Sequence, residues 1–327
     1  MGTLARSLSL ALLLVLLLPA APAQAQGYPA RPIRLLVGFS AGGNTDVAAR
    51  IVARKAGELL GQQVIVENRP GAGGMLAAEA VAQAAPDGYT LLAGTLSTQV
   101  LNLGLQARPR VRMDADFVPL ALTNQAPVLL GVSGSLGVGS VADFVARAKA
   151  RSGSFNYGAP SVGGVGHLAA VMFNRQAGVA AEPVVYKGSS AAVVDLAAGR
   201  VEYLFDGLSV LAPQLAGGRV ALLAISGARR HPDWPQLPTF AEAGYPELSK
   251  LMTWNAWFAP SRTPRAVVEQ LHGALHRALA DPEVAQALKK TGNDVPAALS
   301  LPQLAGFLAA ERERWLPVMR EAGIQPE

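Results

Sequence analysis

Short apolar runs alternate with longer amphipathic stretches along most of the chain. The first apolar run, Ile33–Phe39, has the length and composition of a buried parallel strand, because such strands are covered on both faces. A helix is expected from about Thr45, where charged residues recur every four positions and form one polar stripe. Gly61 is placed to end this helix, since glycine readily adopts the left-handed conformation at a helix C-terminus.

The alternation continues in the order strand, helix, strand, helix, strand. The elements that complete this set are a strand at Val64–Val66, a helix at Met75–Ala84 and a strand at Tyr89–Ala93, with turns at Gly71–Gly74 and Pro86–Gly88. A β-α-β-α-β order predicts a parallel, doubly wound sheet.

The pattern then changes before a second set begins. Phe117–Val132 is long and apolar but is interrupted at Thr123–Gln125, so we interpret it as a strand, a kink and a second strand that crosses between two domains. The elements expected next are helices at Val141–Ala150, His167–Ala177, Ala191–Ala198 and Leu211–Leu215, and strands at Phe155–Tyr157, Val184–Tyr186, Val201–Phe205 and Val220–Ile225. Trp254–Pro260 is the return crossing, and the remainder is helical, over Pro264–Ala280, Glu283–Lys290 and Leu301–Ala322.

These patterns predict an α/β fold of two lobes, each a mainly parallel sheet flanked by helices, with a cleft between them. We assign residues 26–124 and 227–327 to lobe 1 and residues 125–226 to lobe 2, with boundaries known to within about ten residues. Ligands of such sheets bind beyond the carboxyl ends of the strands, so the cleft is the expected site.

Residues 1–25 have the features of a secretory signal peptide. Arg6 precedes an apolar run that ends at Leu18, and Ala23-Gln24-Ala25 is a small-x-small cleavage signature. The run is too short to span a bilayer, although an uncleaved anchor remains the alternative. Cleavage after Ala25 would leave 302 residues (327 − 25).

Composition excludes several classes of protein. With 50% hydrophobic and 16% charged residues the chain is not intrinsically disordered. The absence of cysteine excludes disulfide frameworks, cysteine zinc sites, iron–sulfur clusters and thiol nucleophiles. The formal charge of +5 comes from scattered lysines and arginines without interleaved aromatic residues, so no nucleic-acid partner is expected. His272 and His276 have the spacing of a zinc pair, but Gly273 replaces the glutamate of H-E-x-x-H, and we expect no metal or other cofactor.

A glycine-rich loop, Phe39–Asp46, joins the first strand to the first helix. Its glycines let the backbone approach a ligand, and the helix N-terminus offers unpaired N–H groups with a partial positive charge, which suits a carboxylate or phosphate. A tight turn before a capped helix is the alternative interpretation. A nucleotide phosphate loop is rejected, because Asn44 stands where the lysine would be.

The second lobe repeats this arrangement at Tyr157–His167, where a strand again leads through glycines to a helix. Two helix N-termini that face one cleft from opposite lobes would hold one anionic group. We expect His167 to be a structural hydrogen-bonding residue, and Asp206 either contacts a donor on the ligand or is a plain loop aspartate. Trp254 and Trp257 are expected to pack in the core.

Longer motifs occur in order along the chain. They are Tyr28-Pro29-x-Arg31-Pro32-Ile33, Ala41-Gly42-Gly43-x-Thr45-Asp46-x-x-Ala49-Arg50, Val66-Glu67-Asn68-Arg69-Pro70-Gly71-Ala72-Gly73-Gly74, Pro86-Asp87-Gly88-Tyr89-Thr90-Leu91-Leu92, Tyr186-Lys187-Gly188, Leu237-Pro238-Thr239 and Pro260-x-x-Thr263-Pro264. This set resembles the substrate-binding proteins of tripartite tricarboxylate transporters, the Bug-type receptors, over the whole chain that follows the signal peptide.

The resemblance implies a type II periplasmic-binding-protein-like fold and a non-enzymatic receptor in the periplasm. Such a receptor closes over a small carboxylate and delivers it to a membrane permease, and we expect it to be a monomer without a cofactor. The ligand-binding residues that it implies are Ala41, Gly42, Gly43, Thr45 and Asp46 on one side, Gly163, Gly164 and Val165 on the other, and Thr95, Ser97, Thr98 and Asp206 toward the distal part of the ligand, together with Ser40, Asn44 and Ser161 in the same loops.

Two other functions remain open from the sequence. The same pocket could serve a receptor that signals to a sensor kinase, or a secreted hydrolase could use Ser97 or Ser161 with His167 as its base. The sequence does not name the ligand: a dicarboxylate, a tricarboxylate, an aromatic acid or an acidic amino acid would each fit.

Overall fold

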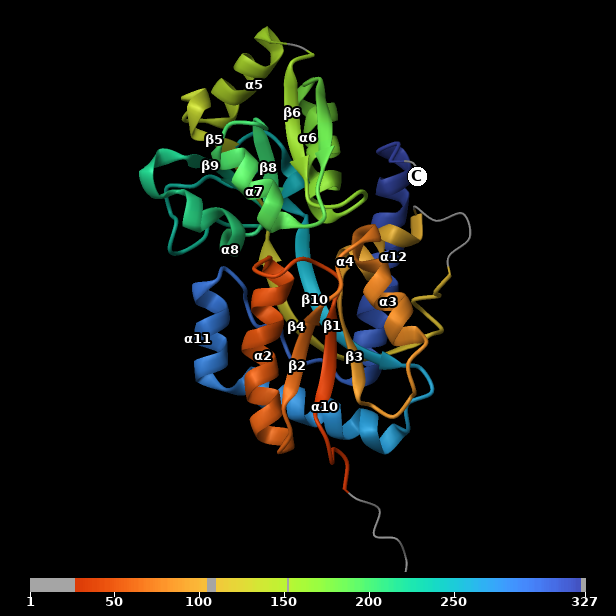
Figure 1. Cartoon of the computed structure of the whole chain (residues 1–327). Coiled ribbons are helices and arrows are strands. Elements are labelled where there is room, and N and C mark those ends of the chain that lie inside the picture. The colour runs from red at the N-terminus through yellow and green to blue at the C-terminus, as the bar shows by residue number, and fades with distance from the viewer. Residues whose placement is uncertain (1–26, 105–109, 152, 325–327) are drawn as a thin grey trace, which may run out of the picture. The chain divides into compact units, whose positions relative to one another are not determined.

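The computed structural model describes residues 27–104, 110–151 and 153–324. The predicted signal peptide, residues 1–25, lies outside the described residues. The chain from Arg31 onward forms one compact unit, which contains two five-stranded sheets (Figure 1). Among the described residues no helix has both the length and the apolar character that crossing a membrane requires.

The first sheet has the strand order β2-β1-β3-β10-β4. Its strands are β1 (Ile33–Val37), β2 (Val64–Asn68), β3 (Thr90–Thr95), β4 (Phe117–Pro127) and β10 (Met252–Pro260). β1 pairs in parallel with β2 and β3, whereas β10 is antiparallel to both of its neighbours. Helices α2 (Asn44–Leu60), α3 (Met75–Ala82), α10 (Arg265–Ala280), α11 (Pro282–Lys290) and α12 (Leu301–Glu321) belong to this lobe, as does the short α4 (Leu96–Gln99).

The second sheet has the order β7-β6-β8-β5-β9 and the same plan. Its strands are β5 (Leu129–Ser133), β6 (Phe155–Ala159), β7 (Ala181–Val185), β8 (Tyr203–Asp206) and β9 (Val220–Ile225). β6 is parallel to β7 and β8, and β5 is antiparallel to β8 and β9. Helices α5 (Val141–Ala150), α6 (Val165–Ala177), α7 (Ser189–Ala197) and α8 (Leu208–Leu211) accompany this sheet, and α9 (Pro246–Ser249) precedes the return strand.

Both sheets are therefore mixed. In each sheet the antiparallel strand occupies the same position in the connectivity of the chain. β5 directly follows β4 of the first sheet, and β10 is the first strand after β9 of the second. Each antiparallel strand is thus the one by which the chain enters that sheet from the other. The two-lobed α/β fold class is confirmed, with one antiparallel strand in each sheet added to the parallel set.

The chain passes between the sheets at Val128, whereas the first of the two predicted strands was expected to end at 123–125. β4 continues through the polar segment 123–125, and only Val128 separates it from β5. The polar segment instead holds a β-bulge: Asn255 pairs with Asn124 and Ala256 with Leu122, which leaves Thr123 as the extra residue. The second-lobe helix expected at 211–215 also begins earlier, since α8 starts at Leu208.

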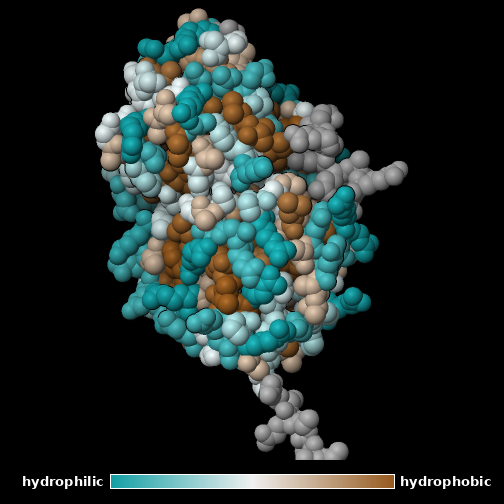
Figure 2. All heavy atoms as spheres, in the orientation of Figure 1, coloured by the Kyte–Doolittle hydropathy of each residue, from teal (hydrophilic) through white to brown (hydrophobic). Residues whose placement is uncertain are grey.

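The core consists mainly of apolar side chains, with a smaller set of buried polar residues. On the face drawn in Figure 2, brown apolar side chains lie between and beneath teal polar ones. Trp254 and Trp257 are each 1% exposed, and Trp254 Nε1 donates to Glu311 Oε2 at 2.8 Å. Both tryptophans therefore pack in the core, as predicted. Gly61 ends α2 in the left-handed conformation (φ 71°), also as predicted.

Candidate functional site

A cavity of about 80 Å³ lies at the carboxyl ends of strands from both sheets. It is lined by Phe39, Gly43, Asn44, Thr45, Thr95, Ser97, Val128, Pro160, Ser161, Gly164, Val165, Gly166, Ser189, Phe205, Asp206, Gly207 and Thr253. Among these lining residues there is no lysine, arginine or histidine, and Asp206 is the single charged side chain. An anionic ligand would therefore depend on hydrogen-bond donors and helix dipoles rather than on an ion pair.

The first loop presents the N-terminus of the 17-residue helix α2 to the cavity. Gly42 has φ 79°, a conformation that favours glycine, and Gly43 caps the helix with extended backbone. The first N–H that bonds into the helix turn is that of Val47, which donates to Gly43 O at 3.0 Å. Within the described residues the N–H groups of Asn44 and Thr45 have no hydrogen-bond acceptor, so they are available to a ligand.

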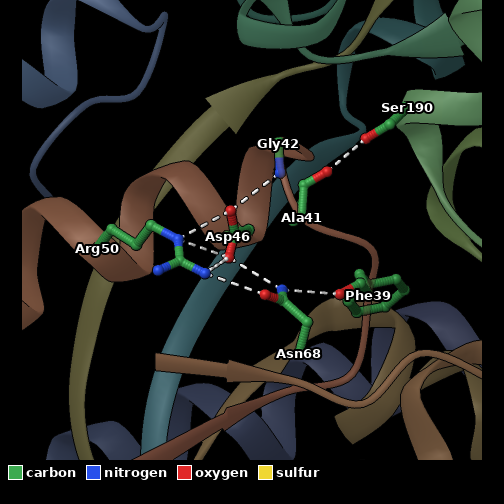
Figure 3. Close-up of polar contacts among 7 residues, drawn as sticks. All are labelled: Phe39, Ala41, Gly42, Asp46, Arg50, Asn68 and Ser190. Atoms are coloured by element: carbon green, nitrogen blue, oxygen red, sulfur yellow. Dashed lines mark hydrogen bonds and ion pairs between the residues drawn. The ribbon is translucent and has the colours of Figure 1, made fainter. Parts of the chain in front are cut away.

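Asp46 stabilises this loop through hydrogen bonds, as Figure 3 shows. Its carboxylate accepts from Gly42 N at 2.9 Å, from Asn68 Nδ2 at 2.9 Å and from Arg50 Nε at 3.0 Å, while Asn68 also donates to Phe39 O at 3.0 Å. Burial alone would raise the pKa of Asp46, but the bonds from Arg50, Gly42 and Asn68 together hold that pKa below its ordinary value. Asp46 therefore shapes the loop as an ionised group, and it does not line the cavity.

The second loop presents the N-terminus of the 13-residue helix α6. Gly164 caps this helix with extended backbone, and the N–H of Val165 donates to Ser97 Oγ of the first lobe at 3.2 Å. Gly163 N donates to His167 Nδ1 at 3.0 Å, and burial lowers the pKa of His167. His167 is therefore a neutral structural acceptor, as predicted. No hydrogen bond joins His167 to Ser97 or Ser161 in the described structure, so the nucleophile–base pair of a hydrolase is not formed.

Asp206 ends β8 and lines the cavity from the second lobe. Its carboxylate accepts from Gly207 N at 2.7 Å and from the Ser189 side chain. Burial raises the pKa of Asp206 to about 6, and no cation among the described residues forms an ion pair with it. The cavity therefore combines two helix N-termini with one carboxylate that accepts hydrogen bonds when ionised.

This arrangement predicts that Asp206 lowers the stability of the fold near neutral pH. The folded-state pKa of Asp206 lies above its ordinary value. Keeping Asp206 ionised in the fold therefore lowers the free energy of unfolding above about pH 6, and this destabilisation disappears as the pH falls toward 4. We expect Asp206→Asn to raise the free energy of unfolding by on the order of 2 kcal/mol at pH 7.5 and by much less at pH 4. Urea denaturation at the two pH values measures the difference.

The exposed Asp114, for comparison, has no contact of this kind, so Asp114→Asn is the matched control and should change little at either pH. A loss of stability in Asp206→Asn at pH 7.5 would contradict the assignment, as would a gain of equal size at both pH values.

The structure brings most of the predicted site residues to the cavity. Those that line it are Gly43, Asn44, Thr45, Thr95, Ser97, Ser161, Gly164, Val165 and Asp206. Those that do not line it are Ser40, Ala41, Gly42, Asp46, Thr98 and Gly163. Several of the second group have other partners: Ala41 O accepts from Ser190 Oγ at 2.7 Å (Figure 3), and Thr98 forms a capping box with Thr95 at the start of α4.

Sequence reasoning missed part of the lining. Phe39, Pro160 and Gly166 lie in the two loops recognised from the sequence but were not named as site residues. The residues outside those loops are Val128, Ser189, Phe205, Gly207 and Thr253. Ser189 begins α7 directly after β7, so the rule that points to the first two loops also points to this residue. Val128 and Thr253 lie where the chain crosses between the sheets, and they belong to no local motif that signals a site.

The histidine pair on α10 does not belong to this site. His272 Nδ1 lies 2.7 Å from Leu120 O, and the rings of His272 and His276 are 4.2 Å apart. Throughout the described residues there is no group of three or more side chains that could hold a metal ion.

Comparison with known proteins places the chain among transporter receptors. Residues 48–324 match the model of the tripartite tricarboxylate transporter family receptor. Protein BugT of Bordetella pertussis is 37% identical over 308 residues, which cover 94% of each chain. MatC (Rpa3494) of Rhodopseudomonas palustris, solved with bound malate, is 33% identical with a TM-score of 0.84 and covers 89% of this chain and 100% of that chain. Rpa4515 of R. palustris, solved with adipate, is 34% identical with a TM-score of 0.87 and covers 92% and 100%.

Proposed function

The chain belongs to the tripartite tricarboxylate transporter receptor family, and on that premise we propose that it captures a small carboxylate between its lobes and delivers it to the membrane permease of such a transporter. The observation that carries the proposal is the meeting of two helix N-termini, from α2 and α6, at one cavity without a cationic side chain. Malate and adipate bound to MatC and Rpa4515 support a carboxylate as the ligand class.

The carboxylate of the ligand would lie against the first turns of α2 and α6. The N–H groups of Asn44 and Thr45 and of Gly166 supply donors, and each helix adds about half a unit of positive charge at its N-terminus. The hydroxyls of Ser97 and Ser161 lie in the same cavity lining. Recognition without a cationic side chain binds a carboxylate by shape, hydrogen bonds and helix dipoles, and it avoids a buried ion pair that must be desolvated.

The distal part of the ligand would face Thr95 and Asp206. The remaining predicted residues act indirectly in this proposal: Ser40, Ala41, Gly42 and Asp46 shape the first loop, Gly163 shapes the second, and Thr98 caps α4. We further propose that residues 1–25 direct export to the periplasm, that the mature chain is a monomer, and that it is a receptor rather than an enzyme.

Ligand capture requires that the ligand bind the closed arrangement more tightly than the open one. Lining residues come from both sheets and from both crossings, at Val128 and Thr253, so closing the lobes completes the site. A ligand thereby shifts the population toward the closed form, which is the form that the permease would recognise.

A thermal-shift screen tests the proposal. Residues 26–327 are freed of co-purified ligand by unfolding and refolding, and are then heated with L-malate, adipate, succinate, citrate, L-glutamate or benzoate and with the amide of each acid. Binding to the folded state alone stabilises it by about 2.7 kcal/mol at a hundredfold excess over the dissociation constant. We expect at least one acid to raise the melting temperature when its amide does not. If no acid does so, or if amides act equally, the carboxylate assignment is wrong.

A further inference from the structure

The two lobes also meet beside the cavity, where α8 contacts α2 and the loop 291–294. Ser209 Oγ of α8 donates to Asn44 Oδ1 of α2 at 2.8 Å. A Cβ atom on Gly292 would lie 2.5 Å from Leu208 Cβ, so the loop and α8 approach each other as closely as glycine allows. Ser209, Leu208 and Gly292 do not line the cavity. Asn44 itself lines the cavity, so the contact adjoins the ligand site, but Ser209, Leu208 and Gly292 can be replaced without removing a lining residue.

On the first-lobe side, a chain of buried asparagines holds Asn44 in place. Asn293 Nδ2 donates to Asn44 Oδ1 at 2.8 Å, and Asn124 Nδ2 donates to Asn293 Oδ1 at 2.6 Å. Asn255 Nδ2 in turn donates to Asn124 Oδ1 at 3.0 Å. Asn124, Asn255 and Asn293 are at most 3% exposed, and a buried polar network of this kind costs free energy if any partner is removed.

The network connects the contact to the strands next to the crossings. Asn124 of β4 and Asn255 of β10 are direct partners in the sheet, and the bulge at Thr123 is next to this pair. The loop is joined to β4 as well, because Gln125 N donates to Asp294 O at 2.9 Å and Asp294 N donates to Gln125 O at 2.7 Å. All of these hydrogen bonds lie within the first lobe, so its half of the contact keeps its arrangement without α8.

We propose that Ser209 and Gly292 act as positioning residues in a closure latch: the contact of α8 with Asn44 and the loop 291–294 keeps part of the ligand-free protein closed. The latch matters for function on the premise of the proposed ligand capture, since the apparent dissociation constant is the intrinsic one divided by the closed fraction. Removing the Ser209 hydroxyl removes one hydrogen bond from the closed form only. The closed-to-open ratio should then fall about fivefold, which corresponds to about 1 kcal/mol.

The chain contains no cysteine, so spin labels can be attached only at cysteines that are introduced, and the distance between the lobes can be measured. Spin labels are attached at Leu59→Cys on α2 and Val194→Cys on α7, two exposed positions in different lobes, and their distance distribution is recorded in the refolded, ligand-free protein. We expect a short-distance population in the otherwise unaltered chain. Ser209→Ala should lower the ratio of short to long distances about fivefold, and Gly292→Ala should remove the short distance, because its methyl group meets Leu208.

Each latch variant has a matched control. Gly217 has φ 75°, close to the 74° of Gly292, but nothing lies within 4 Å of an added Cβ, so Gly217→Ala carries the same backbone strain without the contact. Ser154 Oγ donates to Arg151 O at 2.8 Å within the second lobe, so Ser154→Ala removes one hydrogen bond that does not cross the cleft. Both controls should keep the short distance.

The latch is overturned if the ligand-free chain shows only the long distance, or if Ser209→Ala and Gly292→Ala behave as their controls do. The distances are measured without ligand, so their outcome does not depend on whether the proposed carboxylate binding is correct. Shifted distances together with a failed thermal-shift screen would retain the latch and reject the carboxylate assignment.

Discussion

Gly43→Leu is expected to abolish ligand binding and to leave the fold intact. The backbone of Gly43 (φ −75°, ψ 164°) is one that any residue adopts, and an added Cβ atom would meet only Ser40 O, at 3.4 Å. The rest of the leucine side chain would enter a cavity of about 80 Å³ and cover the N–H groups of Asn44 and Thr45. We expect a loss of at least about a hundredfold in affinity, equivalent to about 2.7 kcal/mol. Calorimetric titration with the acid found by the thermal-shift screen measures this loss.

The control for this substitution is Gly139→Leu, because Gly139 is also free of left-handed strain and has nothing within 4 Å of an added Cβ. Gly43→Ala provides the graded case, since a single methyl group should weaken binding less than leucine does. An unchanged affinity in a folded Gly43→Leu protein would show that the ligand is held away from the N-terminus of α2.

Many individual strands and helices could be predicted from the sequence, because strands are short apolar runs and helices are longer amphipathic stretches. Val220–Ile225 and Val141–Ala150 have the predicted bounds in the structure, as strand β9 and helix α5. Turn chemistry marked many of the remaining boundaries, as at Gly61, where the left-handed conformation ends α2. Element boundaries of this kind depend only on residues that are close in sequence, so tertiary contacts do not shift them.

The strand end predicted at 123–125 is wrong, because it was inferred from local sequence alone. Thr123 and Asn124 are polar, which indicates a break in a strand when each is judged by its neighbours in sequence. In the structure their partners are far away in the chain: Thr123 Oγ1 donates to Asn255 O at 3.1 Å, and Asn124 donates to Asn293. Tertiary hydrogen bonds compensate the burial of these side chains, and no local pattern reveals such partners.

Some residues of the site could be predicted from their neighbours in sequence, whereas others reach the site only through tertiary structure. Both glycine-rich loops were recognised because a strand, a glycine turn and a helix start follow one another directly in sequence. Thr253 lies in β10, far from either loop in sequence, and reaches the cavity only because that strand inserts between β3 and β4. Asp46 was predicted as a ligand-binding residue, and the structure gives its carboxylate three protein partners that leave it out of the cavity lining.

Asp46→Asn is expected to be strongly destabilising for this reason. Asp46 is 2% exposed, and its carboxylate accepts from Gly42, Asn68 and Arg50 at once. Asparagine keeps the size of the side chain but replaces one acceptor oxygen with a donor, which then faces other donors. We expect the free energy of unfolding to fall by about 2–4 kcal/mol at pH 7, with weaker ligand binding because the first loop loses its brace. Urea denaturation and titration of the same samples measure both effects.

The pH dependence separates this role from a simple packing defect. The folded-state pKa of Asp46 lies below its ordinary value, so its stabilising contribution is present above the unfolded-state pKa of about 4 and is lost as the pH falls through the lower, folded-state value. The stability gap between the natural chain and Asp46→Asn should therefore narrow below about pH 4. A gap that stays constant down to pH 2.5 would indicate lost packing rather than lost charge. Arg50→Gln removes the guanidinium donors to Asp46 and Asn68 from a half-exposed side chain. It should destabilise less than Asp46→Asn, because water can replace those donors.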